Sequence, residues 1–193
     1  GEIDKALESY KSAINIKPDY LEVIHMVSAL ENKTTSTAPR AYVENLFDNY
    51  AENFENSLEN QLAYKAPEDF SKLLYKEIKQ KPIRRALDIG CGTGLLGPKI
   101  KHFCDELIGV DLSIKMIQKA KEKNIYQSLF HDEVENFLSS QPLLYDLLIA
   151  LDVFIYVGDL SKIFQLLANR NKSHFYFAFT TEHSSSYSYN LEK

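Results

Sequence analysis

The first third of the chain alternates two amphipathic segments with a polar stretch. Apolar and small residues recur three to four positions apart over residues 1–19, where Pro18 ends the segment. A second stretch of the same kind spans residues 20–30. One apolar face on each segment predicts a pair of packed helices. Residues 31–40 are polar and rich in hydroxyls, which predicts a linker.

Two more helices are predicted before residue 82. Aromatic and aliphatic side chains recur at nearly fourfold spacing from Ala41 onward, at Tyr42, Leu46, Phe47, Tyr50, Phe54, Leu58 and Leu62. A helix from about Ala41 would therefore pack one aromatic stripe against a neighbour. A second apolar face follows Pro67 and stops before Pro82, with Phe70, Leu73, Leu74 and Ile78.

From residue 84 the pattern changes to short apolar runs that alternate with helical segments. Strands are predicted at residues 86–89, 107–110, 126–130, 145–151 and 175–179. Helices are predicted between them at about 94–103, 113–123, 133–140 and 159–169. Strands joined by helical crossovers form parallel sheets, so we expect an α/β fold with a doubly wound parallel sheet.

Composition narrows the class of protein. With 193 residues and 45% hydrophobic side chains, the chain can fill a core, and its net charge of −5 disfavours a general nucleic-acid binder. We find neither an apolar run long enough to span a membrane nor a secretory signal pattern. Two cysteines, Cys91 and Cys104, suit neither a disulfide framework nor a metal site, which indicates a reducing, cytoplasmic location.

Four of the seven glycines, Gly90, Gly92, Gly94 and Gly97, follow the first predicted strand of the sheet. Glycines at such a turn let a ligand lie against backbone amides. Residues 92–97 also fit the dinucleotide fingerprint, a weak signal alone. Asp88 favours a different ligand, because its carboxylate would repel a pyrophosphate and attract a cationic amino acid.

The segment Asp88-Ile89-Gly90-Cys91-Gly92-Thr93-Gly94 resembles the glycine-rich loop of class I S-adenosylmethionine (SAM)-dependent methyltransferases. The resemblance implies a Rossmann-like sheet that binds SAM and releases S-adenosylhomocysteine (SAH). It further implies that Asp88 receives the ammonium group of the methionine moiety, and that Gly90, Cys91 and Gly92 lie against the ligand.

Later segments match the same family in the expected order. Asp111 ends the second strand, where an acid can accept hydrogen bonds from both ribose hydroxyls. Leu112 and Met116 follow, and the resemblance implies that they lie near the adenine, although Met116 alone would suit a core position. After the third strand, either Asp132 or Glu133, followed by Val134, is the implied adenine contact, and either acid could instead stabilise a helix start. Leu151 and Asp152 should line the pocket, and Asp152 could equally cap a turn.

Two resemblances concern the N-terminal part. The order Gly1, Ala6, Tyr10, Ala13 and Pro18 resembles half of a tetratricopeptide repeat (TPR), with an ordinary helical hairpin as the alternative. Residues 39–54, joined to such a remnant, resemble the bacterial TPR-containing methyltransferases. This implies that Tyr42 and Tyr50 lie near the methionine end and that Tyr64 lines the substrate entrance, whereas the plain alternative makes all three tyrosines core residues.

These expectations define four segments. They are a TPR-like hairpin at 1–32, a linker at 33–40, a helical lid at 41–82 and a SAM-binding core at 83–193. Upstream repeats would supply a surface for a protein partner. The family's sheet has seven strands, but only 11 residues follow Glu182. The last two strands and part of the substrate pocket are therefore expected to be missing.

The predicted function is methyl transfer from SAM to a small-molecule acceptor. Alignment and desolvation carry most of such a reaction, so a dedicated base is optional. Tyr50, Asp152 and His183 are candidates if the acceptor must lose a proton. Two alternatives remain open, namely an interaction module with a vestigial or regulatory SAM site, and a nicotinamide-dependent oxidoreductase.

Overall fold

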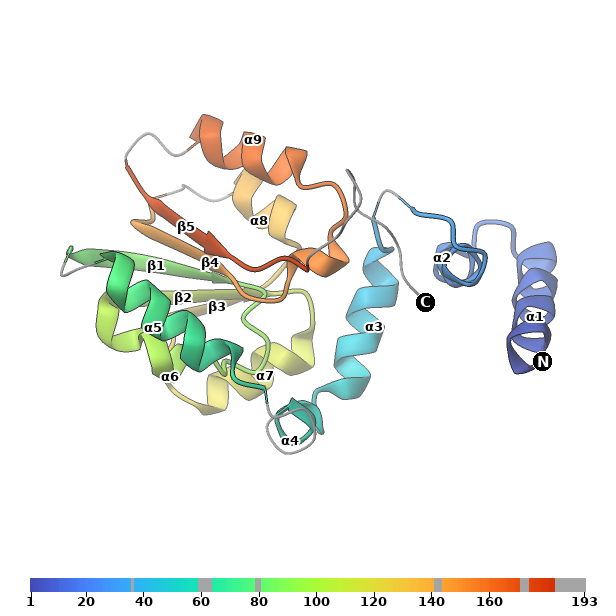
Figure 1. Ribbon diagram of the computed structural model, residues 1–193, viewed down its shortest axis with the longest axis horizontal. Helices are drawn as coiled ribbons and strands as arrows, with labels where there is room; N and C mark the ends of the chain where they lie inside the picture. Colours follow the sequence, from blue (N-terminus) through green and yellow to red (C-terminus); the bar gives the residue numbers. More distant parts are fainter. Residues whose placement is uncertain (36, 59–63, 79–80, 141–143, 171–173, 183–193) are drawn as a thin grey trace.

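The computed structural model describes residues 1–35, 37–58, 64–78, 81–140, 144–170 and 174–182. A five-stranded parallel sheet with the order β3-β2-β1-β4-β5 forms its centre (Figure 1). Its strands are β1 (Ile83–Ile89), β2 (Cys104–Asp111), β3 (Ser128–His131), β4 (Leu147–Ala150) and β5 (Tyr176–Phe179). The predicted α/β class with a parallel sheet is confirmed.

Helices cover both faces of the sheet. On one face lie α8 (Val134–Ser140) and α9 (Ser161–Arg170), and on the other lie α5 (Ala66–Ile78), α6 (Gly97–Ile100) and α7 (Ile114–Glu122), as Figure 1 shows. Successive side chains of a strand point to opposite faces. The fully buried Leu87 therefore packs in the core beneath α8 and α9, while Ala86 packs in the core beneath α5 and α6.

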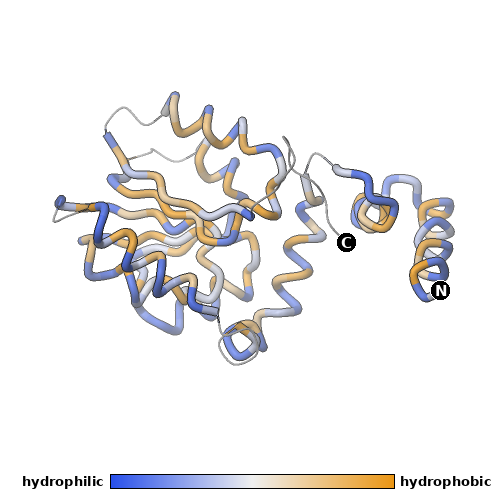
Figure 2. Tube along the Cα trace, viewed as in Figure 1, coloured by the Kyte–Doolittle hydropathy of each residue, from blue (hydrophilic) through white to orange (hydrophobic). Residues whose placement is uncertain are grey.

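The inner strands are apolar because both of their faces are covered. All four residues of β4 are buried, and Figure 2 shows the hydrophobic runs of the inner strands side by side. At the edge, β3 is mostly exposed. Polar side chains can therefore reach the interior of the sheet only at the strand ends.

The N-terminal helices are α1 (Glu2–Ile16) and α2 (Leu21–Leu30), and they lie beyond α3 (Arg40–Tyr50) when seen from the sheet (Figure 1). Helix α1 has no buried residue among those described, whereas α2 buries Val23 and His25. The His25 ring packs on Tyr42 at 5.1 Å between centroids, and its Nδ1 lies 3.0 Å from the Thr35 hydroxyl. The helical pair agrees with the predicted hairpin, and its relation to repeat proteins stays a prediction.

Several elements differ from their predictions, and β1 and β2 each begin three residues earlier and β4 two residues later than expected. The helix expected at 94–103 is the four-residue α6 followed by a 3₁₀ turn (Lys101–Phe103), because four glycines and Pro98 leave little chain for a longer helix. The aromatic helix breaks at residues 51–53 and resumes as the short α4 (Phe54–Asn56), while Leu62 lies outside the described residues. The strand expected from Tyr126 starts at Ser128, although the Gln127 amide already donates to the Leu107 carbonyl of β2.

Within the described ranges, no helix is long and apolar enough to cross a membrane. The same residues contain no group of three or more His, Cys, Asp and Glu side chains placed to hold a metal ion.

Candidate functional site

A cavity of about 500 Å³ opens at the carboxyl ends of the strands. Its floor comes from the residues that follow β1, β2, β3 and β4, and its cover comes from α3 and α4. The strand order reverses between β1 and β4, since the chain runs outward from β1 to β3 and then returns. Open α/β sheets bind their ligands at this switch point.

The glycine loop lines the cavity through Gly90 and Gly92, whose φ angles are 64° and 53°. Only glycine adopts this left-handed backbone region without strain. An ideal Cβ on Gly92 would lie 3.7 Å from Phe54 Cε1, its nearest neighbour, and would occupy space between the loop and the cover. Gly94 and Gly97 instead face Tyr126, so their lack of a side chain serves packing.

Asp88 is the most deeply buried charged group at the site, with 2% of its surface exposed. The Tyr126 hydroxyl donates a hydrogen bond to Asp88 Oδ2 at 2.7 Å. Burial raises the pKa of the Asp88 carboxyl to about 7, the Tyr126 hydrogen bond opposes this rise, and the Asp111 carboxylate adds to it. A cationic ligand group would therefore restore the ionised form.

Asp111 joins the end of β2 to the glycine loop. Its Oδ2 accepts a hydrogen bond from the Gly92 amide and its Oδ1 accepts one from the Ser113 amide, both at 2.8 Å. Burial raises the pKa of the Asp111 carboxyl, and these two amides oppose the rise. An ionised carboxylate has about four acceptor positions, so each oxygen keeps capacity for a ligand hydroxyl.

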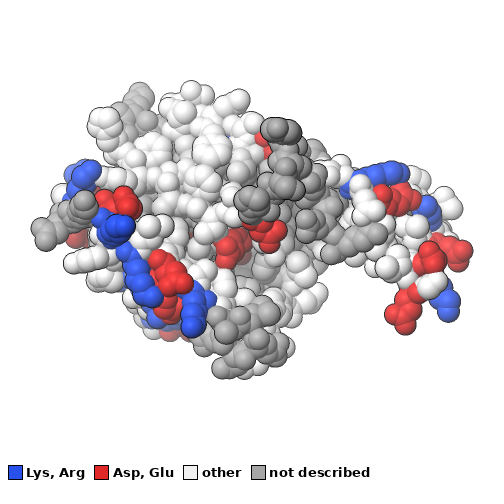
Figure 3. All heavy atoms as spheres, viewed as in Figure 1, with Lys and Arg blue, Asp and Glu red and all other residues white. Residues whose placement is uncertain are grey.

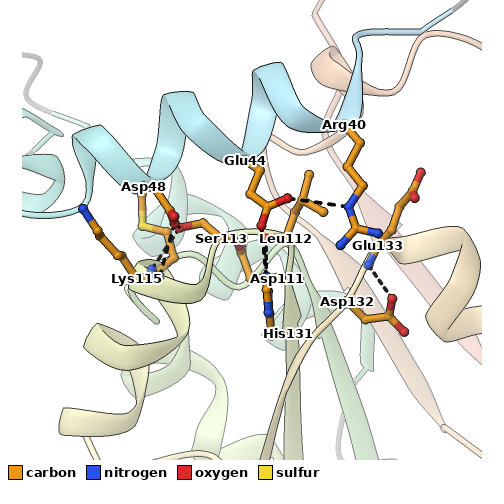
Figure 4. Close-up of polar contacts among 11 residues, drawn as sticks. Arg40, Glu44, Asp48, Asp111, Leu112, Ser113, Lys115, His131, Asp132 and Glu133 are labelled. Carbon is orange, nitrogen blue, oxygen red and sulfur yellow. Dashed lines mark hydrogen bonds and ion pairs between the residues drawn. The ribbon is translucent and has the colours of Figure 1, made fainter.

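The side of the cavity beside β2 and β3 combines apolar surface with acids. Leu112, Met116 and Val134 line it, and Met116 is 1% exposed. Both predicted acids, Asp132 and Glu133, also line it. Asp132 Oδ1 accepts a hydrogen bond from the Glu133 amide at 2.8 Å, so one of its oxygens is already engaged by the backbone (Figure 4).

Helix α3 lies across these strand ends and is held by polar contacts (Figure 4). Asp48 accepts hydrogen bonds from the Ser113 hydroxyl and, at 3.3 Å, from the Lys115 amide. Glu44 lies 3.6 Å from Arg40 and 3.5 Å from His131. The cavity-facing side of α3 is apolar and aromatic, with Val43, Leu46, Phe47 and Tyr50.

Charge pairing extends this contact along α7. Lys119 pairs with Glu52 at 3.1 Å and Lys123 pairs with Glu55 at 2.7 Å. Two acids of the α3–α4 segment therefore form ion pairs with two lysines that lie one helical turn apart along α7 and its C-terminal end. Val43 is the only residue of α3 that is buried in the described structure, so polar contacts form much of its attachment.

The end of β4 presents Asp152 in the left-handed region, with φ 56°. Tyr64 donates a hydrogen bond to Asp152 Oδ2, and the Thr180 hydroxyl donates one to Oδ1 at 2.7 Å. The Asp152 amide donates to the same Thr180 oxygen at 2.7 Å. Burial and the Asp152 carboxylate raise the pKa of Tyr64 well above its usual range, so Tyr64 remains a proton donor to Asp152.

Most predicted site residues lie together at this cavity. Tyr42 is an exception, since it is not among the described lining residues and its ring packs on His25. His183 lies outside the described residues. The sequence reasoning missed many lining side chains. Phe47 and Phe54 were visible only as part of an amphipathic stripe, and others include Arg40, Val153 and Tyr156.

Comparison with known proteins agrees with this architecture. A family model described as "Methyltransferase domain" matches residues 87–172. Nodulation protein S of Rhizobium tropici is 26% identical over 102 residues, which cover 51% of this chain and 42% of that protein. Ubiquinone biosynthesis O-methyltransferase of Proteus mirabilis is 28% identical over 101 residues, 49% of this chain and 41% of that protein. The chain thus spans less than half the length of these relatives.

Solved structures share the fold. A SAM-dependent methyltransferase from Clostridium acetobutylicum has a TM-score of 0.58 at 23% identity, covering 67% of this chain and 56% of that one. The complex titled DhpI-SAM-HEP has a TM-score of 0.59 at 16% identity, and the match covers 76% of this chain and 67% of that one. Magnesium protoporphyrin IX methyltransferase from Synechocystis with bound SAH has a TM-score of 0.53 at 18% identity, and the match covers 69% of this chain and 68% of that one.

The structural likeness establishes the fold, and the family match covers the segment that carries the glycine loop and the strand-end acids. The family match and the curated relatives make this chain similar to methyltransferases over about half of its length.

Proposed function

We propose that this chain binds SAM in the cavity and transfers its methyl group to a small-molecule acceptor. The observation that carries the proposal is a pair of acids on either side of a glycine loop at the switch point of the sheet, the buried Asp88 and the partly buried Asp111. Asp88 would hold the ligand's ammonium group, and Asp111 would hold its ribose hydroxyls. Gly90, Cys91 and Gly92 would lie against the methionine moiety.

The adenine would occupy the side formed by β2 and β3. Met116, Leu112 and Val134 offer apolar surface for the ring, and Asp132 or Glu133 would accept a hydrogen bond from its amine. Both acids remain candidates, because the Glu133 amide engages only one of the two Asp132 oxygens and a carboxylate has about four acceptor positions. The open space beside Gly92, which a Cβ would fill, fits a ligand that lies close to the loop.

A dinucleotide fits the same cavity less well. Its pyrophosphate would face the carboxylates of Asp88 and Asp111, and Arg40 is the one basic residue among the described lining residues. In the alternative fingerprint, Gly94 would approach the pyrophosphate, yet it packs on Tyr126 and is not among the lining residues described. These contacts disfavour the oxidoreductase alternative.

When bound, SAM supplies an activated methyl group on a sulfonium with a good leaving group. The residues of this chain would align the acceptor with that methyl group and exclude water. Phe47, Tyr50 and Phe54 of the cover provide the apolar enclosure. Tyr50 and Asp152 also line the cavity, so either could contact an acceptor that loses a proton.

The N-terminal part has a separate proposed role. We assign residues 1–32 to a TPR-like hairpin, 33–40 to a linker and 41–82 to a lid, with the SAM-binding core at 83–193. Helix α1 exposes Ile3 and Ile16, with 56% and 86% of their surface exposed, and stacked repeats would cover this apolar surface.

Cys91 and Cys104 are buried free thiols, which agrees with a reducing location such as the cytoplasm.

Calorimetric titration tests the proposal. We expect SAH to bind in the low micromolar range or somewhat weaker, about 6 to 8 kcal/mol, and NAD to bind far less tightly. At 100 times its dissociation constant, SAH should raise the free energy of unfolding by about 2.7 kcal/mol. NAD binding tighter than SAH would overturn the assignment.

A further inference from the structure

The charge of the cavity restricts what can enter it. Its described lining includes six carboxylates, at Asp88, Asp111, Asp132, Glu133, Glu135 and Asp152, and one guanidinium, at Arg40. Arg40 already pairs with Glu44 at 3.6 Å. Figure 3 shows acidic side chains in the middle of the displayed face, while the visible bases gather over α5 and the N-terminal hairpin. An anionic acceptor would meet repulsion here.

The strand order separates Asp152 from the acids assigned to SAM. Asp132 follows β3, Asp111 is the last residue of β2, and Asp88 lies in β1, so these three occupy one side of the switch point and its centre. Asp152 follows β4, on the other side of β1. Of the other lining acids, Glu135 is paired with Lys162, and Asp132 and Glu133 follow β3, so Asp152 is the lining acid on the β4 side of the switch point.

Asp152 is held in one place. The Tyr64 and Thr180 hydroxyls bond to its two oxygens, and its own amide bonds to Thr180. The φ angle of Asp152 is 56°, in a backbone region that few residues other than Gly, Asn and Asp adopt. Residues in such regions are often found at functional sites. Both oxygens retain acceptor positions for a ligand.

Aromatic rings enclose the space beside this carboxylate. Phe47 packs edge-on against Tyr156 at 5.1 Å between centroids, and Tyr50 packs edge-on against Phe54 at 5.5 Å. All four line the cavity together with Asp152. Aromatic faces and a carboxylate are the surfaces that attract an organic cation.

We infer that the methyl acceptor is an amine that binds next to Asp152 within this aromatic enclosure. The inference rests on the proposed function and adds the chemical class of the acceptor. An ammonium acceptor would first pass one proton to water, so that the Asp152 carboxylate stays ionised. The nitrogen lone pair then forms the N–C bond as the S–C bond breaks, and the broken bond's electron pair stays on sulfur.

The direction in which charge moves during methyl transfer explains why this site would prefer a nitrogen acceptor to an oxygen acceptor. In this transfer, positive charge moves from sulfur to the acceptor nitrogen, where Asp152 stabilises it. An oxygen acceptor would have to react as an anion or lose its proton, and the surrounding carboxylates would raise the energy of that anion. The same acids therefore favour nitrogen and disfavour phenolate or carboxylate acceptors.

The test uses three probes of one shape, with no need for the natural acceptor. The full chain is first titrated with SAH and is then titrated, while saturated with SAH, with 2-phenylethylamine, 2-phenylethanol and 3-phenylpropanoate. We expect the amine to bind at least tenfold more tightly than the alcohol, and the carboxylate to bind most weakly. Asp152→Asn should abolish the preference for the amine and leave SAH affinity unchanged.

Asparagine suits this test because it tolerates the left-handed conformation as well as aspartate does. The matched control is Asp159→Asn, the same change of charge seven positions on, where the carboxylate caps α9 through the Ser161 amide and is not among the described lining residues. SAH binding without a preference for the amine would overturn this inference alone. Failure of SAH to bind would overturn the proposed function and the inference with it.

Discussion

The Asp48 carboxylate on α3 accepts a hydrogen bond from the Ser113 hydroxyl, which caps α7. The same Ser113 oxygen accepts a hydrogen bond from the Met116 amide at 3.1 Å. The cover of the cavity is thus attached to the turn that carries Asp111 and begins the helix of Met116. Movement of α3 and the geometry of the cavity floor are therefore coupled through one hydroxyl group.

Ionisation of Asp88 should lower the free energy of unfolding of the ligand-free protein. Its folded pKa of about 7 lies above the unfolded value of about 3.9, so between these values the folded state binds the extra proton. The free energy of unfolding should then fall as pH rises from about 4 to about 7. Denaturant unfolding at several pH values checks this expectation.

The matched variant for this prediction is Asp88→Asn, whose side-chain oxygen can still accept the Tyr126 hydroxyl. It should lose less stability than the natural chain over the same rise in pH. Parallel stability curves for the two proteins would show that Asp88 is already ionised in the folded state.

Asp111→Asn should weaken both the fold and ligand binding. The new amide group would face a backbone N–H that now donates to the carboxylate, so we expect a loss of about 1 to 2 kcal/mol in the free energy of unfolding. Loss of a charge-assisted bond to the ribose should weaken SAH binding by about 2 kcal/mol. Asp105→Asn, an exposed change at the start of the same strand, is the control. Unchanged SAH affinity in a folded Asp111→Asn variant would remove Asp111 from the site.

Gly90 and Gly92 should respond differently to a methyl group. Both substitutions to alanine carry backbone strain of about 1 to 3 kcal/mol because φ is positive. At Gly90 the new Cβ would also lie 2.4 Å from Val153 Cγ2, whereas at Gly92 it would meet nothing closer than 3.7 Å. Gly90→Ala should therefore destabilise the protein more in urea unfolding.

Val153→Ala supplies the internal control for this prediction. It should recover part of the stability lost in Gly90→Ala and none of that lost in Gly92→Ala. Gly92→Ala should instead reduce SAH affinity, since its methyl group would enter the cavity. Equal behaviour of the two double variants would refute the proposed contact with Val153.

Local patterns predicted the sheet well because its buried strands are short and continuous in apolar residues, as in β4. They also predicted the acids at the strand ends, since parallel strands bring those ends to one edge. Contacts between distant segments were not visible. The Tyr64 hydrogen bond to Asp152 joins residues 88 positions apart, and the Asp48 contact with Ser113 spans 65.

Tyr42 shows the limit of the family resemblance. The resemblance implied that Tyr42 lies near the methionine end, yet its ring packs on His25 of α2 and it is not among the described lining residues. The spacing of apolar residues along a helix predicts which side of the helix each residue lies on, but it does not predict which other element packs against that side. The register of α3 against both α2 and the sheet decides which aromatic ring reaches the cavity.

Helix α3 should behave as a lid held by polar contacts. Because it buries only Val43 among its described residues, its amides should exchange hydrogen faster than those of β1, whose residues Ala86, Leu87 and Ile89 are fully buried. Bound SAH would add surface beneath Phe47 and Tyr50, so exchange over about residues 41–56 should slow markedly when SAH is added. Hydrogen exchange followed by mass spectrometry checks both expectations.

Two variants separate this lid from a permanent part of the core. Asp48→Ala removes the contact with Ser113 and should speed exchange in α3 without SAH, while Asn49→Ala, an exposed change in the same turn, should not. Tyr50→Phe should weaken SAH binding by about 1 to 2 kcal/mol if its hydroxyl bonds the methionine carboxylate. A core helix would instead show the same strong protection with and without SAH, and Tyr50→Phe would leave SAH affinity unaltered. Exchange that does not respond to SAH would reject the lid and, with it, the role of Tyr50 in ligand binding.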